Sequence, residues 1–260
     1  MIKKKLGKSK KNTEIQVIYG YHAVSAALQN RIRNHECLYI IQKYKDLFKQ
    51  NPKISSKIKI LSNKEMIKIF GNNNLTQGIV LKTSKLPKKI FKEVFNNNDL
   101  NKKKSIVVLL DQVTDPNNIG SIMRSCSLFN CSSLILSKDH APDLTSAMIK
   151  SASGAAEIVN YIQVVNINRT INDLKKIGYW VIGLDSNSKN NNSKFSLPEK
   201  CVLVLGSEGR GIRNLTKKEC DDLISLPFNP KTNYGIDSLN VSNACSIALY
   251  EHYIQHFKKT

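Results

Sequence analysis

Three short apolar runs in this chain each lead toward a cluster of polar residues or glycines. The runs cover residues 107–110, 201–205 and 223–226. Short, continuous apolar runs are typical of strands in a parallel sheet, because helices cover both faces of such a sheet. Ligands of open α/β sheets bind beyond the carboxyl ends of the strands. The sequence therefore predicts an α/β fold with its binding site where these runs end.

The first cluster is DPNNIGSIMR at residues 115–124. Asp115 and Pro116 provide turn and cap chemistry, since a carboxylate accepts from free backbone N–H groups and proline fits the first helical turn. The apolar residues that follow at helical spacing are Ile119, Ile122, Met123 and Leu128. The motif is therefore expected on a loop that joins a strand to a helix.

The other two clusters are LGSEGRGI at residues 205–212 and SLNVSNA at residues 238–244. Three glycines in the second cluster allow a sharp turn of the backbone and close approach to a ligand. Serine and asparagine in the third cluster can cap a helix that continues to Phe257.

In this order, the three clusters resemble the motifs of the SpoU branch of the SPOUT RNA methyltransferases. The resemblance covers residues 105–257 and includes KSASGA at residues 150–155. The matching positions are Asn118, Gly120 and Arg124, then Gly206, Glu208, Gly209 and Gly211, then residues 238–242. Each motif alone is weak, but three in family order are highly specific.

The resemblance implies transfer of a methyl group from S-adenosyl-L-methionine to a ribose 2'-hydroxyl of RNA. It also implies a C-terminal SPOUT domain with a deep trefoil knot, one of the exceptions to the near absence of knots in proteins. The strand from Leu223 and the segment from Ser238 would form the knotted part. The family is dimeric, so a homodimer is expected in which the partner subunit contributes to the site.

The resemblance also implies roles for particular residues. Those expected to fix the reacting groups are Asn118, Arg124, Glu208, Ser238 and Asn240. Backbone groups near Gly206, Leu226 and Leu239 are expected to hold the cofactor. Helix capping is the alternative role for Asn118 and Asn240, and it is compatible with a role in the site.

Arg124 is often described in this family as assisting deprotonation of the hydroxyl. A guanidinium is effectively always protonated, so we favour two roles that keep its charge. It would pair with an RNA phosphate and stabilise negative charge as the hydroxyl proton departs. The sequence leaves open whether Arg124 also takes the proton.

Residues 13–84 are predicted to form a separate small α/β domain. Residues 19–24 begin a helical pattern that runs through Leu28, and Asn63 is expected to cap a second helix that ends at Phe70. Strands are expected at residues 38–41, 58–61 and 78–81. The opening YGYHAVSAAL and the closing LTQGIVL are similar to the ribosomal-protein-like substrate-binding domain of bacterial rRNA members of the family. Relatives that act on tRNA generally lack this domain, so a guanosine ribose of large-subunit rRNA is the favoured substrate.

The charge of the chain agrees with an RNA partner. The chain has 40 Lys and Arg against 20 Asp and Glu, a net charge of +20 that attracts polyanions. Lysines concentrate in residues 1–12, predicted as a basic disordered tail, and in residues 85–104, predicted as a linker. The methyltransferase domain is then expected at residues 105–260. A merely solvated surface is the alternative interpretation of any single lysine cluster.

The sequence indicates neither a metal site nor a membrane segment. Six cysteines form no C-x-x-C pair and lie mostly in apolar elements, which predicts buried, reduced thiols. His252 and His256 lack further ligands nearby, so surface or core roles are expected for them. Because no apolar run approaches the roughly 20 residues that span a bilayer, a cytosolic protein is expected.

Other functions fit the motifs less well. Gly206, Gly209 and Gly211 do not form the G-x-G-x-x-G of dinucleotide-binding enzymes, and no P-loop sequence occurs. A tRNA ribose methyltransferase and a non-catalytic RNA-binding ribosome-assembly factor are the alternatives.

One departure from the family is the link at residues 228–237, which is longer than usual and borders the expected cofactor site.

Overall fold

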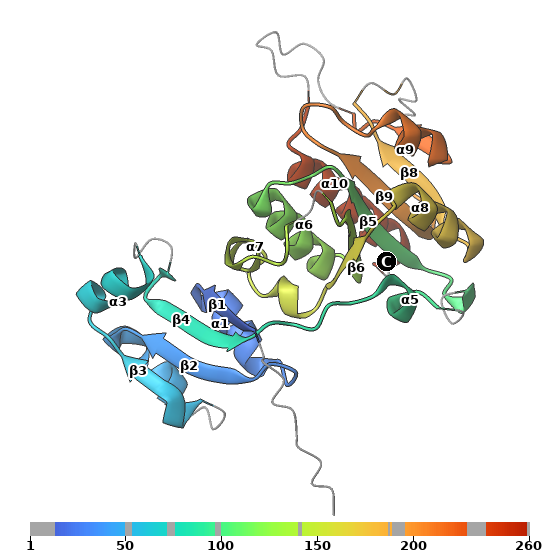
Figure 1. The fold of residues 1–260 in the computed structure, drawn as a ribbon. Coiled ribbons are helices and arrows are strands. Elements are labelled where there is room, and N and C mark those ends of the chain that lie inside the picture. The colour runs from blue at the N-terminus through green and yellow to red at the C-terminus, as the bar shows by residue number, and fades with distance from the viewer. Residues whose placement is uncertain are drawn as a thin grey trace, which may run out of the picture.

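Two β-sheets, each with its own helices, organise the protein (Figure 1). The structure is a computed structural model that describes residues 14–49, 54–71, 76–96, 100–139, 142–186, 188, 196–227 and 238–258. The predicted tail at residues 1–12 and the long link at residues 228–237 lie outside the described residues. The α/β class with a parallel sheet, predicted from the apolar runs, is confirmed.

The first sheet is small and mostly antiparallel. Its strands, in spatial order, are β1 (Ile15–Tyr19), β4 (Ile79–Ser84), β2 (His35–Ile40) and β3 (Ile58–Ile60). Its helices are α1 (Tyr21–Gln29), α2 (Lys45–Lys49) and α3 (Asn63–Phe70), with short 3-10 turns at Gln42–Tyr44 and Ser55–Lys57. Alternate strand residues such as Ile18, Leu38 and Leu81 are fully buried in the same cluster as the apolar side of α1.

Helix α3 ends at Phe70, as predicted, but begins one residue earlier and has a different cap. Ser62, rather than the predicted Asn63, is the N-cap residue. Its side chain accepts from the Glu65 backbone N–H at 3.3 Å, and the Glu65 carboxylate accepts from the Ser62 backbone N–H at 2.8 Å. This reciprocal capping box satisfies two N–H groups at once, which a cap at Asn63 would not do.

The second sheet has six parallel strands. In spatial order they are β10 (Asp222–Ile224), β8 (Trp180–Leu184), β9 (Lys200–Gly206), β5 (Ser105–Asp111), β6 (Ser133–Ser137) and β7 (Asn160–Val164). Residues 106–111 of the central strand β5 are all buried. Alternate residues of β5 therefore enter two different cores: Ile106, Val108 and Leu110 lie in one, and Val107 and Leu109 in the other.

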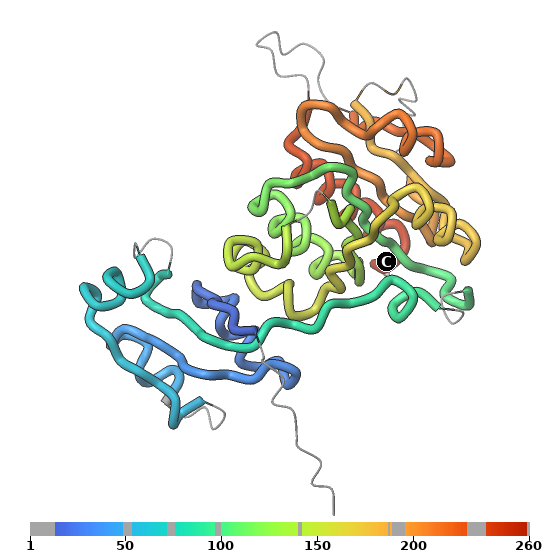
Figure 2. The backbone as a smooth tube through the Cα atoms, in the orientation of Figure 1, coloured from blue at the N-terminus to red at the C-terminus, as the bar shows by residue number. Residues whose placement is uncertain are grey.

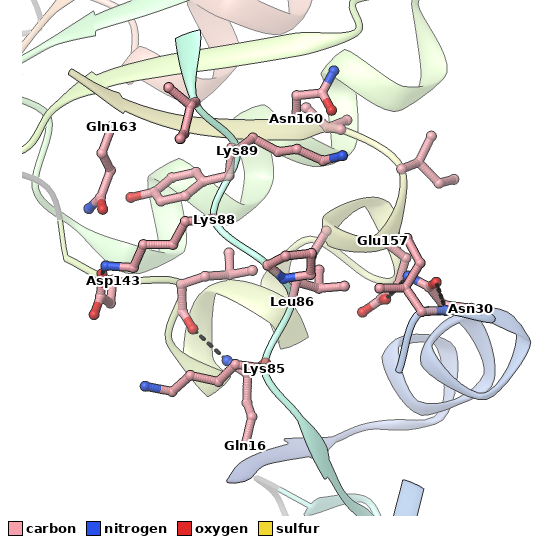
Figure 3. Close-up of a pocket in the computed structure, with 18 of the residues that line it drawn as sticks. Gln16, Asn30, Lys85, Leu86, Lys88, Lys89, Asp143, Glu157, Asn160 and Gln163 are labelled. Carbon is pink, nitrogen blue, oxygen red and sulfur yellow. Dashed lines mark hydrogen bonds and ion pairs between the residues drawn. The ribbon is translucent and has the colours of Figure 1, made fainter. Parts of the chain in front are cut away.

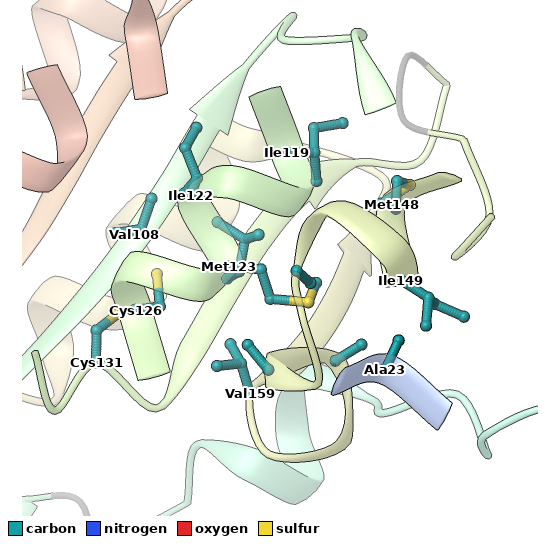
Figure 4. Packing of buried hydrophobic residues seen from close by; sticks show 14 of the residues in the cluster. Ala23, Val108, Ile119, Ile122, Met123, Cys126, Cys131, Met148, Ile149 and Val159 are labelled. Carbon is teal, nitrogen blue, oxygen red and sulfur yellow. The ribbon is translucent and has the colours of Figure 1, made fainter. Parts of the chain in front are cut away.

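Helices cover both faces of this sheet. They are α6 (Pro116–Leu128), α7 (Ser146–Ser151) and α10 (Val241–His256) on one face, and α5 (Phe91–Val94), α8 (Ile167–Lys176) and α9 (Asn214–Glu219) on the other. A 3-10 turn at Ala155–Glu157 follows α7. Helix α6 packs centrally, with Ile119 and Met123 among its fully buried side chains (Figure 4).

The two sheets share one continuous core. Ala23 of α1 belongs to the same buried cluster as Met148 and Ile149 of α7, and Figure 4 shows these side chains together. A buried ion pair, Arg33 Nη2 to Glu157 Oε1 at 2.7 Å, also joins the two parts. Its side chains are 0% and 5% exposed. The first sheet is thus held firmly against the second.

The segment predicted as a linker contains ordered structure. Figure 2 shows the chain running from β4 toward the second sheet and into α5 and β5. Within it, Phe95 is buried and meets the Tyr179 ring edge to face, with centroids 6.2 Å apart. Lysines dominate the composition of this segment, but its two phenylalanines, Phe91 and Phe95, bury apolar surface against the second sheet.

Five of the six cysteines are buried and Cys220 is half-buried, which confirms the predicted burial. Burial raises the pKa of the Cys220 thiol to about 12. His252 is fully buried and His256 half-buried, in agreement with core and surface roles. Within the described part of the chain, no helix has both the length and the apolar character needed to cross a membrane.

Candidate active site

The carboxyl ends of four parallel strands meet at one edge of the second sheet. β5 and β9 are paired in register from Ser105 with Lys200 to Asp111 with Gly206. β8 pairs in parallel with β9, and β10 with β8. The predicted strand at residues 223–226 is observed one residue earlier and shorter, as β10. The loops that carry the three sequence clusters leave from this edge or return to it, as expected for a ligand site of an α/β sheet.

The start of α6 orients Asn118. The Asp115 carboxylate caps the helix by accepting from the backbone N–H groups of Asn117 and Asn118, each at 3.2 Å. Such a cap contributes about 1 kcal/mol to helix stability. Because Asp115 is the cap, the Asn118 side chain is available for other contacts. Its Nδ2 donates to Oε1 of Glu208 at 2.9 Å.

Asn240 both caps α10 and joins the same contact. Its Oδ1 accepts from the Ser242 backbone N–H at 2.9 Å and from Ser242 Oγ at 2.6 Å. The amide nitrogen must therefore face the other way. It donates to Oε1 of Glu208 at 2.5 Å and to Oδ1 of Asn118 at 3.1 Å. Asn118, Glu208 and Asn240, one from each sequence cluster, thus form a single network, which we call the motif cluster.

Two glycines permit the backbone packing around the motif cluster. A Cβ atom at Gly206 would lie 1.9 Å from the Gly211 carbonyl carbon. A Cβ atom at Gly120 would lie 2.6 Å from the Met148 carbonyl oxygen. Both distances are far below van der Waals contact. Gly206 therefore allows the loop after β9 to fold back on itself, and Gly120 allows α6 to pack closely on α7.

A cavity of about 270 Å³ lies beside the motif cluster. The three residues expected to hold the cofactor, Gly206, Leu226 and Leu239, all line it, together with Glu208 and Ser238. The remaining lining comes from the ends of β8 and β9 and the loops that follow them, from α9 and from the start of α10: Leu184, Asp185, Ser186, Leu205, Ser207, Gly209, Arg210, Gly211, Lys217, Val241 and Ala244. Seven of the eight predicted site residues therefore gather in the motif cluster or around this cavity.

Arg124 is the predicted residue that does not join them. It lies six residues after Asn118 on α6, about 9 Å further along the helix axis. Its side chain is exposed, and it has no ion-pair partner among the residues described. The same helix and its neighbour α10 also expose apolar side chains: Leu128 of α6 is 65% exposed, and Ile247 and Tyr250 of α10 are 42% and 48% exposed.

A larger cavity, about 490 Å³, lies at the junction of the two sheets (Figure 3). Most of its charged groups are paired: Lys85 with Glu14 at 2.6 Å, Lys88 with Asp143 at 2.9 Å, and Glu157 with Arg33. Lys89 and Lys138 line it as well. None of the predicted site residues is among the described residues that line it. The smaller cavity is therefore the candidate cofactor site, despite its size.

Comparison with known proteins identifies the family. Residues 105–250 match the SpoU rRNA Methylase family. The chain belongs to this family. Residues 17–89 also match the family described as RNA 2'-O ribose methyltransferase substrate binding. The resemblance inferred from the three motifs is thereby confirmed for the chain as a whole.

Relatives in the SpoU family align along nearly the full chain. The "23S rRNA (guanosine-2'-O-)-methyltransferase RlmB" of Coxiella burnetii is 33% identical over 244 residues, covering 92% of this chain and 95% of the relative. The RlmB of Vibrio cholerae is 31% identical over 247 residues, covering 91% and 95%. Among solved structures, the SpoU methyltransferase AviRb of Streptomyces viridochromogenes, in complex with AdoMet, superposes with a TM-score of 0.73 at 20% identity, covering 92% and 89%. That structure shares the fold.

Two ion pairs that support this SpoU site were not singled out by the sequence motifs. Asp111, fully buried at the end of β5, accepts from Arg213 Nε at 2.8 Å and from the Arg213 backbone N–H at 3.0 Å. Lys217 pairs with Asp185 at 2.5 Å on the cavity wall. The sequence does contain a signal for the pair of Asp111 and Arg213: Asp111 ends an apolar strand, and a buried carboxylate requires a partner. The second pair carries no such signal.

Proposed function

We propose that this protein methylates the 2'-hydroxyl of a ribose in RNA, with S-adenosyl-L-methionine as methyl donor and a guanosine of large-subunit rRNA as substrate. The observation that carries the proposal is the motif cluster beside the smaller cavity, since three separate sequence motifs meet there. The RlmB name of the relatives at 33% and 31% identity supports the choice of nucleoside and RNA.

The cavity suits the cofactor through its shape and its backbone. Gly206 ends β9, Leu226 follows β10 and Leu239 precedes α10, so the cavity lies beyond the carboxyl ends of the strands, where ligands bind in α/β sheets. When bound, the cofactor supplies an electrophilic methyl group on a positively charged sulfur. The ribose hydroxyl oxygen would take that methyl group, the sulfur would keep the electron pair of the broken carbon–sulfur bond, and the hydroxyl proton would pass to a nearby acceptor or to water.

The motif cluster orients the reacting ribose. A ribose hydroxyl is a weak nucleophile at neutral pH, so rate depends on alignment with the methyl group and on assisted loss of the proton. Ser238 lies exposed at the cavity wall, where its hydroxyl can contact the ribose, and Glu208 presents a carboxylate to the same space. Asn118 and Asn240 fix Glu208 by donating to one of its oxygens. The remaining acceptor capacity of that carboxylate serves the substrate.

Arg124 acts in this account from a second subunit. Its distance from Asn118 along α6 separates it from the cluster of its own chain. The apolar surface of Leu128, Ile247 and Tyr250 favours a homodimer through α6 and α10, since exposed apolar patches mark interaction sites. In such a dimer Arg124 pairs with an RNA phosphate and stabilises charge at the partner's site.

The trefoil knot and the division into domains belong to the same proposal. β10 lies at the edge of the sheet, whereas α10 packs on α6 and contacts the central strand β9. These positions are compatible with threading of the segment from Ser238. We infer a ribosomal-protein-like RNA-binding domain at residues 13–84, a connector at 85–104 and the methyltransferase domain at 105–260. An rRNA substrate would place the reaction in the cytosol.

The test is transfer of labelled methyl from S-adenosyl-L-methionine to unmodified large-subunit rRNA and, separately, to bulk tRNA. Alkali-resistant sites are then mapped, because 2'-O-methylation blocks cleavage at that ribose. We expect label at a single guanosine of the rRNA and none in tRNA. Label in tRNA alone would support the tRNA alternative. No label in either RNA, with no cofactor binding, would support a non-catalytic RNA-binding factor.

A further inference from the structure

One face of the first sheet carries a line of tyrosines and lysines that the motif cluster does not use. Tyr19 on β1 lies opposite Val80 on β4, Val80 lies opposite Tyr39 on β2, and Tyr39 lies opposite Lys59 on β3. Residues directly opposite one another in a sheet point to the same face. Lys82, two residues after Val80 on β4, also points to this face. We call Tyr19, Tyr39, Lys59 and Lys82 the lysine–tyrosine row.

The opposite face of the sheet is not available to a partner. Ile18, Leu38 and Leu81 on that face are fully buried beneath α1. The row lies on the other side of the sheet, where α3 covers part of the surface: Val80 is fully buried, and Phe70 of α3 meets the Tyr39 ring edge to face. Lys59 is exposed there, and Tyr19, Tyr39 and Lys82 are half-buried. The row spans three strand spacings of about 4.8 Å, or roughly 14 Å.

Two ammonium groups of the row surround one ring. Nζ of Lys82 lies 5.5 Å and Nζ of Lys59 lies 5.8 Å from the centroid of the Tyr39 ring. A ring face attracts a cation but leaves its N–H donors free for other acceptors. Among the residues described, neither lysine forms an ion pair, and Glu36, the carboxylate that influences Tyr39, does not pair with them. Like charges held together without a counter-ion favour an anionic ligand.

The row leads toward the candidate active site. Lys150 on α7 lies over the Tyr19 ring at 5.6 Å and continues the row onto the second sheet's helices. The next residue, Ser151, donates from Oγ to the Asn117 carbonyl oxygen at 3.0 Å. Asn117 precedes Asn118 in the first turn of α6. A ligand lying along the row is thus directed to the end of α6 that carries the motif cluster.

We propose that the lysine–tyrosine row holds a strand of the RNA substrate, with its phosphates on Lys59 and Lys82 and unpaired bases against the tyrosines. The inference rests on the proposed function, because it takes RNA as the substrate. Alternating aromatic rings and cations suit single-stranded RNA, whose phosphates repeat along the chain and whose bases stack on rings. The match of residues 17–89 to a family of RNA methyltransferase substrate-binding segments agrees with this position.

The test compares two lysine pairs by the same substitution. Lys59→Gln/Lys82→Gln removes the charges of the row. Lys43→Gln/Lys176→Gln removes two exposed charges elsewhere: Lys43 makes the same kind of contact with Tyr44, at 4.7 Å, and Lys176 is 74% exposed on α8. Both double variants have the same net charge. Lys43, Lys59 and Lys176 are exposed and contribute little to folding, whereas Lys82 is half-buried.

Binding to in vitro transcribed large-subunit rRNA is measured by filter retention between 50 and 200 mM salt. We expect the row variant to bind about tenfold more weakly and its salt dependence to fall by roughly 1.5, since each lost phosphate contact removes about 0.7 to 0.9 from the slope. The control pair should stay within about twofold of the wild type. Equal weakening in both variants, or none in the row variant, would overturn the inference.

The outcomes separate this inference from the proposed function. If the wild type binds rRNA through the row but transfers no methyl group to it, the proposed function fails while the row stands. If methyl transfer occurs at a single ribose but the row variant binds like the wild type, the row fails while the function stands.

Discussion

The motif cluster and the lysine–tyrosine row handle charge in opposite ways. In the motif cluster, Glu208 is fixed by two amide donors and each amide has a second contact. In the row, Lys59 and Lys82 lie over an aromatic ring and form no ion pair with any residue that the structure describes. Positioned, mutually bonded groups give a fixed geometry, whereas unpaired ammonium groups give attraction that tolerates many sequences. The first property suits a chemical step and the second suits holding RNA.

The comparison also explains why the two regions must be fixed relative to each other. A row that holds RNA can deliver a particular ribose only if its distance from the motif cluster is constant. The buried pair Arg33–Glu157 and the shared core of α1 and α7 provide that constancy. Three further contacts cross the same junction: Gln16 Nε2 to the Leu144 carbonyl at 2.7 Å, Ser146 Oγ to the Val17 carbonyl, and Asn30 Nδ2 to Glu157 at 2.7 Å.

The largest effect is expected from breaking that junction. Arg33→Met leaves the Glu157 carboxylate buried without its cation, so the free energy of unfolding should fall by about 3–5 kcal/mol, measured by urea denaturation. The control is Arg33→Met/Glu157→Leu, which removes both charges and should recover most of the loss. A loss below about 1 kcal/mol in the single variant would mean that the junction is not held by this pair.

The next largest effect tests the chemical role of the motif cluster. Asn240→Ser keeps a good helix cap but removes the amide that donates to Glu208. We expect methyl transfer to fall by about 10²–10³-fold, as for loss of one positioned donor, with little change in melting temperature. Asn240→Ala should lose the same activity and about 1 kcal/mol of stability besides. Normal activity in the serine variant would reduce Asn240 to a helix cap.

A smaller effect sharpens the assignment of Arg124 to the second subunit. Arg124→Ala and Asn240→Ala should each be inactive alone. If Arg124 acts across a homodimer, a mixed dimer keeps one intact site, so equal mixing followed by subunit exchange should restore about a quarter of wild-type activity. Methyl transfer is measured before and after exchange. No recovery, with mixed dimers demonstrated by mass, would place Arg124 in the site of its own chain.

The smallest effect concerns pH and lies away from both regions. Burial and the nearby His256 lower the pKa of His252 to about 4. In the unfolded chain the pKa is near 6.5, so between these values the unfolded state binds a proton that the folded state does not. Stability should therefore fall as pH decreases from about 6.5 to about 4, by at most about 1.4 kcal/mol per pH unit, and be unaffected by this group above that range. His252→Phe should flatten the dependence in urea denaturation, and an unchanged slope would contradict the assignment.

The motif cluster could be predicted from sequence because its chemistry requires particular residues at fixed places. Glycines at 120 and 206 and amides at 118 and 240 cannot be exchanged freely, so their pattern is recognisable. Apolar runs also predicted strands that overlap β2, β3, β4, β5, β9 and β10, whereas β1, β6, β7 and β8 were not predicted. Ser62 was missed as a cap because Ser62 and Asn63 are both good capping residues, and only the reciprocal bond to Glu65 separates them.

The lysine–tyrosine row had no comparable signal. Tyr19, Tyr39, Lys59 and Lys82 are widely separated in sequence and become neighbours only through the strand order β1-β4-β2-β3. In a chain with 40 Lys and Arg, no single lysine stands out. The packing of Phe95 against Tyr179, within the segment predicted as a linker, was not predicted either, because composition alone does not reveal such a contact.

The most direct test of the division between chemistry and RNA holding is a pair of saturation curves. Methyl transfer is measured against rRNA concentration for Asn240→Ser and for Lys59→Gln/Lys82→Gln. The account predicts a large fall in kcat with little change in KM for the first variant, and a rise of about tenfold in KM with recovery of rate at saturating rRNA for the second. If both variants lose kcat and KM together, the two regions are one functional unit and the account is contradicted.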